Sequence, residues 1–200
     1  MKIATIVSSN SHVEYLARVV DSLDSNEPPP ADAYGFGSFV VIEPGNERGA
    51  VVGSVYNSLL MNPDYANYGP RLSSKEELAS FSPDFLDEQG CLLAVILLGS
   101  LGAAGERHQG IPYTVIPAGA DVRIMTESEI EEFHIDGNGS ISLKYYSHII
   151  GQAGSFAFPL LEAIIERLGG LKACRTEDRS KLDVLRRSLA WQRTVGGIRL

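Results

Sequence analysis

Residues 149–158 read Ile149-Ile150-Gly151-Gln152-Ala153-Gly154-Ser155-Phe156-Ala157-Phe158. A phosphate-binding loop has the pattern G-x-x-x-x-G-K-[ST] between a strand and a helix, and its lysine and hydroxyl hold phosphate and Mg²⁺. With Gly151 as the first glycine, Phe156 replaces the second, Ala157 the lysine and Phe158 the hydroxyl. A strand predicted at 141–150 and a helix predicted at 160–168 keep the frame of such a loop. The segment is therefore interpreted as a phosphate-binding loop that has lost its cation and its metal ligand.

The composition is that of an ordinary soluble domain. The chain has 200 residues, of which 44% are hydrophobic and 21% charged, enough for one domain with a sizeable core. Its longest apolar run, 91–98, is far shorter than the roughly 18–20 residues of a membrane helix. Two cysteines make neither a disulfide framework nor a metal site. We expect a cytoplasmic protein without membrane attachment.

The charge is distributed unevenly along the chain. The net charge of −8 combines −13 over residues 1–171 with +5 over residues 172–200. An acidic body disfavours broad attachment to nucleic acid, because affinity for phosphates comes largely from Lys and Arg. The basic tail at 172–200 could contact nucleic acid or an acidic surface, including the body of another copy; the plainer alternative is a solvated helix face.

The order of predicted elements is that of a β-barrel followed by helices. The fold class is mainly β with α, a six-stranded barrel over 1–125 with a loop and helix insertion at about 61–90. A strand–loop–helix at 126–170 and a basic helical tail at 171–200 follow. The individual predictions are strands at 2–9, 13–20, 36–43, 50–60, 91–101 and 141–150, a short extended piece at 111–116, a capped helix at 126–133, a tight turn at 136–139, and helices at 160–168 and 177–193.

The chain resembles the HerA-like family of hexameric DNA translocases, which begin with a six-stranded HAS barrel shared with rotary ATP synthase subunits. The resemblance rests on residues 3–9, 37–43, 50–55, 111–122 and 143–155. In that family the last segment leads from a core strand into G-Q-T-G-S-G-K-S. Gly151, Gln152, Gly154 and Ser155 match that motif, whereas the three residues that follow them do not.

These departures remove the expected enzymatic activity. Phosphoryl transfer depends on the lysine and the metal for electrostatic stabilisation, and we expect the residues after Phe158 to be too few to include the acidic strand that holds Mg²⁺. We therefore predict no ATPase activity, no catalytic residues and no cofactor. Phe156 and Phe158 are expected to be core residues that anchor the following helix.

Three functions remain open from the sequence. The first is a non-catalytic assembly or protein-interaction module, because the resemblance implies that the barrel serves ring assembly and partner docking. The second is a nucleotide sensor without hydrolysis, binding through Gly151, Gln152, Gly154 and Ser155 at a helix N-terminus. The third is a nucleic-acid accessory protein that uses the basic tail at 172–200.

Other candidate sites have plainer explanations. Asp136 begins a turn that resembles part of a calcium loop but lacks two of its ligands, so a turn is favoured. The acidic residues around His134 predict an exposed helix that could dock a basic partner, and the histidines lack zinc-ligand spacing. Cys91 is expected in the core. Leucines at 182, 185 and 189, with Trp191, predict an amphipathic helix that packs either on its own barrel or on another subunit.

Overall fold

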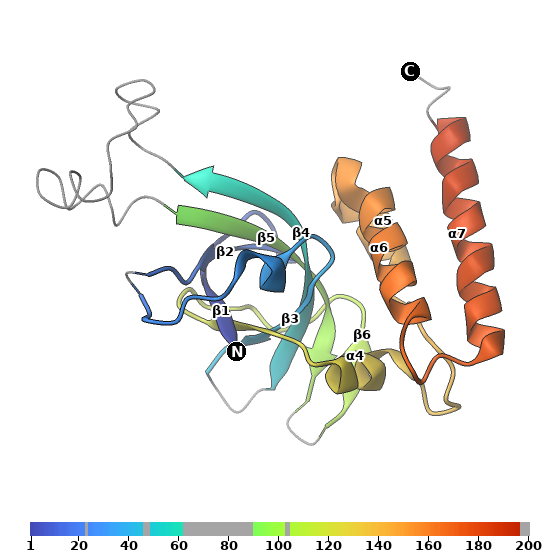
Figure 1. The fold of residues 1–200 in the computed structure, drawn as a ribbon, viewed down its shortest axis with the longest axis horizontal. Coiled ribbons are helices and arrows are strands. Elements are labelled where there is room, and N and C mark those ends of the chain that lie inside the picture. Colours follow the sequence, from blue (N-terminus) through green and yellow to red (C-terminus); the bar gives the residue numbers. More distant parts are fainter. Residues whose placement is uncertain (23, 46–48, 62–89, 103–104, 197–200) are drawn as a thin grey trace, which may run out of the picture.

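The protein is a closed antiparallel β-barrel with helices on one side (Figure 1). The computed structural model describes residues 1–22, 24–45, 49–61, 90–102 and 105–196, so the predicted helix in the insertion lies outside the described residues. Six strands close the barrel in the order β2-β1-β7-β3-β4-β5, with β5 pairing back onto β2, and β6 extends the sheet beyond β5. The strands are β1 (Lys2–Ser9), β2 (Glu14–Val19), β3 (Phe39–Glu43), β4 (Ala50–Met61), β5 (Gly90–Leu101), β6 (Arg107–Gln109) and β7 (Asp121–Ile124).

Side chains of the strands alternate between two cores. In β3, Val40 and Ile42 point into the barrel, whereas Phe39 and Val41 belong to the core outside it. Successive side chains of a strand face opposite sides, so a strand covered on both faces is apolar at consecutive positions. This explains the uninterrupted apolar run of β5, which is buried throughout its middle.

The helices form two further layers against the outer wall made by β3, β4 and β5. The inner layer, next to the barrel, contains α5 (Tyr146–Gln152), the 3₁₀ turn η2 (Gly154–Phe156) and α6 (Ala157–Gly169). The outer layer is α7 (Thr176–Gly196), which packs on α6 (Figure 1). Leu160, Leu161 and Ile164 of α6 are fully buried in the core that the helices share with the barrel wall. The apolar face of α7 uses Leu182 and Leu189, as predicted, and packs within its own chain. Trp191, in contrast, is 66% exposed.

Several sequence predictions need correction. Residues 141–150 do not form a strand: Ile141 makes one isolated bridge to Ile135, and α5 begins at Tyr146. Residues 111–116 join no strand and bend at 113–114, and the sixth barrel strand is β7, which is not among the predicted strands. The unit predicted over 126–170 as strand–loop–helix thus contains three α-helices, at Glu127–His134, Tyr146–Gln152 and Ala157–Gly169, and no named strand.

The helix α4 (Glu127–His134) begins as predicted, with Thr126 as its N-cap. The Thr126 hydroxyl accepts from the Glu129 N–H, and the Glu129 carboxylate accepts from the Thr126 N–H at 2.8 Å. Arg123 of β7 adds two hydrogen bonds to the same carboxylate, at 2.8 and 3.0 Å. The pKa of Glu129 is lowered to about 2, and the hydrogen bonds from Arg123 are the largest cause of this shift. Glu129 thus fastens α4 to the barrel wall.

Replacing Glu129 by glutamine should lower the free energy of unfolding at pH 7 by about 1 kcal/mol, because it weakens the capping box and the bond to β7 together. The ionised carboxylate stabilises the fold above its usual pKa, and this contribution is lost as the pH falls from about 4.5 toward 2. Urea titrations at pH 7 and pH 3 measure both effects. Glu127→Gln removes the same charge from an exposed position of the same turn, and an equal loss in that variant would contradict the assignment.

Candidate functional site

The segment that resembles a phosphate-binding loop forms a different structure. Gly151 and Gln152 lie in the last turn of α5, Gly154 has a positive φ of 55°, and Ser155 is exposed in η2. A helix therefore precedes the segment in place of a strand, and α6 starts at Ala157, whose side chain is buried. The structure does not bring the four candidate residues together as a phosphate cradle.

Phe156 is not a core residue, contrary to the sequence prediction. It is 37% exposed, and its ring centroid lies 6.1 Å from that of Phe36 and 6.2 Å from that of Tyr56. The small Ala157 takes the buried position instead, and Phe158 is partly buried against the helical core. As a result Phe156 stands over one end of the barrel.

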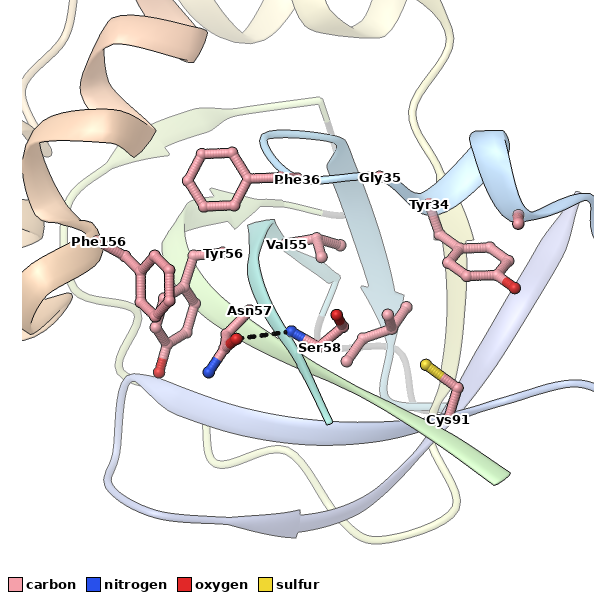
Figure 2. A pocket seen from close by; sticks show the side chains of 11 residues that line it. Tyr34, Gly35, Phe36, Val55, Tyr56, Asn57, Ser58, Cys91 and Phe156 are labelled. Atoms are coloured by element: carbon pink, nitrogen blue, oxygen red, sulfur yellow. Dashed lines mark hydrogen bonds between the residues drawn. The ribbon is translucent and has the colours of Figure 1, made fainter. Parts of the chain in front are cut away.

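A pocket opens at this end of the barrel, and we call it the rim pocket. Its volume is ≈ 340 Å³, within the usual range for ligand sites. Phe36, Tyr56 and Phe156 gather at one end of it, while Tyr34 lies beside Cys91 at the other (Figure 2). The lining residues come from the loop around η1 (Ala31–Tyr34), from β4, from β5 and from η2: Ala31, Tyr34, Gly35, Phe36, Val55, Tyr56, Asn57, Ser58, Cys91, Leu93 and Phe156.

The polar groups of the rim pocket are uncharged. Burial raises the pKa of Tyr34 and of the Cys91 thiol, so both keep their protons at neutral pH. Burial, followed by a hydrogen bond to Glu14, raises the pKa of Tyr56. The half-buried Cys91 packs against the barrel core and is a neutral thiol, not an activated nucleophile. The pocket suits an apolar group with neutral hydrogen-bonding partners.

A second surface lies on residues 111–116, which we call the strap. His12 Nε2 donates to the Pro112 carbonyl at 2.7 Å, and the Ile116 N–H donates to the Tyr15 hydroxyl at 3.3 Å. Ile116 is buried in the barrel core, so the strap is fixed at both ends. Its alternate side chains point outward, and the exposed fractions are 50% for Ile111, 95% for Tyr113 and 70% for Val115.

Several other groups identified in the sequence are structural. His134 is fully buried rather than exposed with its acidic neighbours, and Asp136 accepts from the N–H groups of Asn138 and Ser140 in the predicted turn. Three cations of the basic tail lie in ion pairs: Lys181 with Asp178, Arg186 with Asp183 and Arg193 with Glu162. Among the described residues, no three His, Cys, Asp or Glu side chains gather as metal ligands. Within the same part of the chain, no helix is both long and apolar enough to cross a membrane.

Neither the rim pocket nor the strap was predicted as a site from the sequence. For the strap, the sequence predicted only a short extended piece at 111–116, and the alternation of Ile111, Tyr113 and Val115 does not tell whether that face is buried or exposed.

Comparison with known proteins gives a family without an assigned activity. A search of curated proteins finds no significant match to this chain. A family model described as a domain of unknown function, DUF8166, matches residues 1–199, which is almost the whole sequence. The chain therefore belongs to the DUF8166 family.

Proposed function

We propose that the protein is a non-catalytic HAS-type barrel that acts as an assembly or protein-interaction module. It would be related to HerA-like proteins but lack their ATPase motor. The closed six-stranded barrel supports this relation. The helical course of residues 146–169, where a motor domain would begin, supports a role without phosphoryl transfer.

The exposed strap is the observation that carries this proposal. Ile111, Tyr113 and Val115 form a row of apolar side chains on a segment that hydrogen bonds hold to the barrel. Apolar side chains gathered on a fixed surface are typical of protein contacts, because burying them in a partner removes their area from water. Ordering the segment beforehand also reduces the entropic cost of association.

Light scattering of the purified full chain over a range of concentrations tests the proposal. We expect a dimer or larger assembly that dissociates when Tyr113→Ser and Val115→Ser are combined, because the variant replaces most of the exposed apolar area of the strap. Trp191→Ser removes a 66% exposed aromatic side chain from α7 and should leave the assembly intact. A wild-type protein that stays monomeric at every concentration would contradict self-assembly through the strap.

A further inference from the structure

The rim pocket lies beside an open edge of the barrel sheet. Register pairs join β3 to β4 only over Val51–Ser54, and the chain before β3 adds two bonds to Val55. Followed toward the N-terminus, this segment separates from β4 at Gly37, whose φ is +81°. Beyond this point residues 57–61 of β4 pair with β5, and no other described strand pairs with them. The edge that β3 leaves free forms one wall of the rim pocket, and the loop at Tyr34–Phe36 forms the other.

Within the part of the chain that the structure describes, the edge at 57–61 lacks the usual protection against strand pairing. The Ser58 N–H donates to its neighbour's side-chain oxygen, Asn57 Oδ1, at 2.9 Å (Figure 2). An incoming carbonyl can replace that bond, because a side-chain amide is a local and movable acceptor. Residues 57–61 contain no charge and no proline, the devices that normally prevent edge pairing. Leu60 is 87% exposed, and Leu59 and Met61 are exposed by 44% and 41%.

We propose that this edge binds an extended peptide segment of another protein by β-augmentation. The peptide would occupy the place that β3 vacates, and one large apolar side chain would enter the rim pocket between Phe36, Tyr56 and Phe156. Main-chain hydrogen bonds would provide affinity, and the pocket would select the side chain. This inference rests on the proposed interaction role and gives it a second, separate surface.

The walls and charges of the site define the partner. The loop at Tyr34–Phe36 and the β4 edge both line the pocket, and from this two-sided lining we infer that the occupant is a single extended chain and not a second barrel. The cavity of ≈ 340 Å³ is far larger than the ~30 Å³ share of one water molecule, so it accommodates a bulky side chain. Asp32 is exposed on η1, Glu14 lies behind Tyr56, and residues 1–171 carry a net charge of −13. The peptide is therefore neutral or basic.

The experiment selects peptides on the immobilised full chain from a phage-displayed library of random nine-residue sequences. The leading clone is synthesised with a fluorescent label, and its affinity is measured by anisotropy. We expect enriched peptides with a large apolar residue and with Lys or Arg. Ser58→Pro and Phe36→Ala should each weaken binding at least about tenfold, since the first blocks main-chain pairing and the second removes a pocket wall. Hydrogen exchange of the amides at 57–61 should slow when the peptide binds.

Controls separate this inference from the strap. Phe36 is 46% exposed and Ser58 lies at a sheet edge, where proline is tolerated, so thermal melts should show both variants folded. Tyr113→Ser should leave peptide affinity unchanged, and the two edge variants should leave the oligomeric state unchanged. Absence of any enriched clone, or affinity unaffected in both edge variants, would refute peptide binding at this edge. Dissociation of the oligomer by the edge variants would also overturn it, because the occupant would then be a second copy.

Discussion

Leu160→Ala should lower the free energy of unfolding by about 2–5 kcal/mol, a large part of the roughly 5–15 kcal/mol that a domain of this kind possesses. Leu160 is fully buried in the core that α6 shares with the barrel wall. Truncation leaves a cavity among close-packed neighbours and forfeits the transfer free energy of the deleted groups. Urea denaturation followed by circular dichroism measures the loss. Leu60→Ala deletes the same atoms from an 87% exposed position and should change stability by less than about 0.5 kcal/mol.

The same titration examines how the barrel and the helices depend on each other. Phe39 and Val52 of the barrel belong to one buried cluster with α6 and α7. A shared core predicts a single cooperative transition, and Leu160→Ala should move the whole transition rather than a helical part of it. A barrel transition that stays in place while the helices unfold earlier would show that residues 126–196 fold as a separate unit.

The barrel could be predicted because its signal is local. Val40 and Ile42 alternate with Phe39 and Val41, and long apolar runs such as the one in β5 are typical of strands covered on both faces. The sixth barrel strand, β7, was harder to recognise, because its four residues include Asp121 and Arg123 and depend on pairing with β1 and β3.

The error at residues 141–150 has a physical cause. Apolar residues recur at every second position from Ile141 to Tyr145, which indicates a strand, but tertiary contacts decide otherwise. Tyr145 and Ile149 are both fully buried and lie four residues apart, on one face of a helical turn. His148 donates to the carbonyl of Leu97 at 2.9 Å, so α5 satisfies a backbone acceptor of the barrel wall. None of these contacts is visible in a local pattern.

The rim pocket could not be predicted for a different reason. Its aromatic side chains come from positions 34–36, 56 and 156, and only the folded barrel brings them together. Phe156 was recognised as a departure from a phosphate-binding pattern, but its sequence neighbours do not reveal that Phe36 lies opposite. The glycines at 151 and 154 suggested a phosphate-binding loop. In the structure, the Phe156 ring beside them forms part of the wall of the rim pocket.

His134→Gln should remove the larger part of the acid-dependent loss of stability that we expect of the wild-type protein between pH 7.5 and 5. His134 Nδ1–H donates to the Ile130 carbonyl at 2.7 Å, and Nε2 accepts from the Tyr145 hydroxyl at the same distance. The imidazole is fully buried, with aromatic edge contacts to Phe39 and Phe133. Burial lowers the pKa of His134 to about 4, against 6.5 for the unperturbed side chain. The folded protein therefore holds the neutral form.

The direction of the pH effect follows from that difference. Above pH 6.5 both states are neutral at this position and the contribution to stability is complete; below it the unfolded chain binds a proton that the folded chain excludes. Stability should fall by about 2 kcal/mol by pH 5 and continue to fall until pH 4, since each pH unit is worth about 1.4 kcal/mol. Carboxylates such as Glu129, whose pKa is about 2, change the stability only at lower pH and do not contribute between pH 7.5 and 5.

Two histidine variants make the measurement specific. His12→Gln changes an exposed ring and should retain the wild-type dependence. His148→Gln should remove a smaller part of it, because burial also lowers the pKa of the half-buried His148. Urea titrations at pH 7.5, 6.0 and 5.0 on all four proteins compare the slopes directly. If His134→Gln keeps the wild-type slope, the proton that destabilises the fold binds elsewhere, and the pair formed by His134 and Tyr145 is not the acid-sensitive link between α4 and α5.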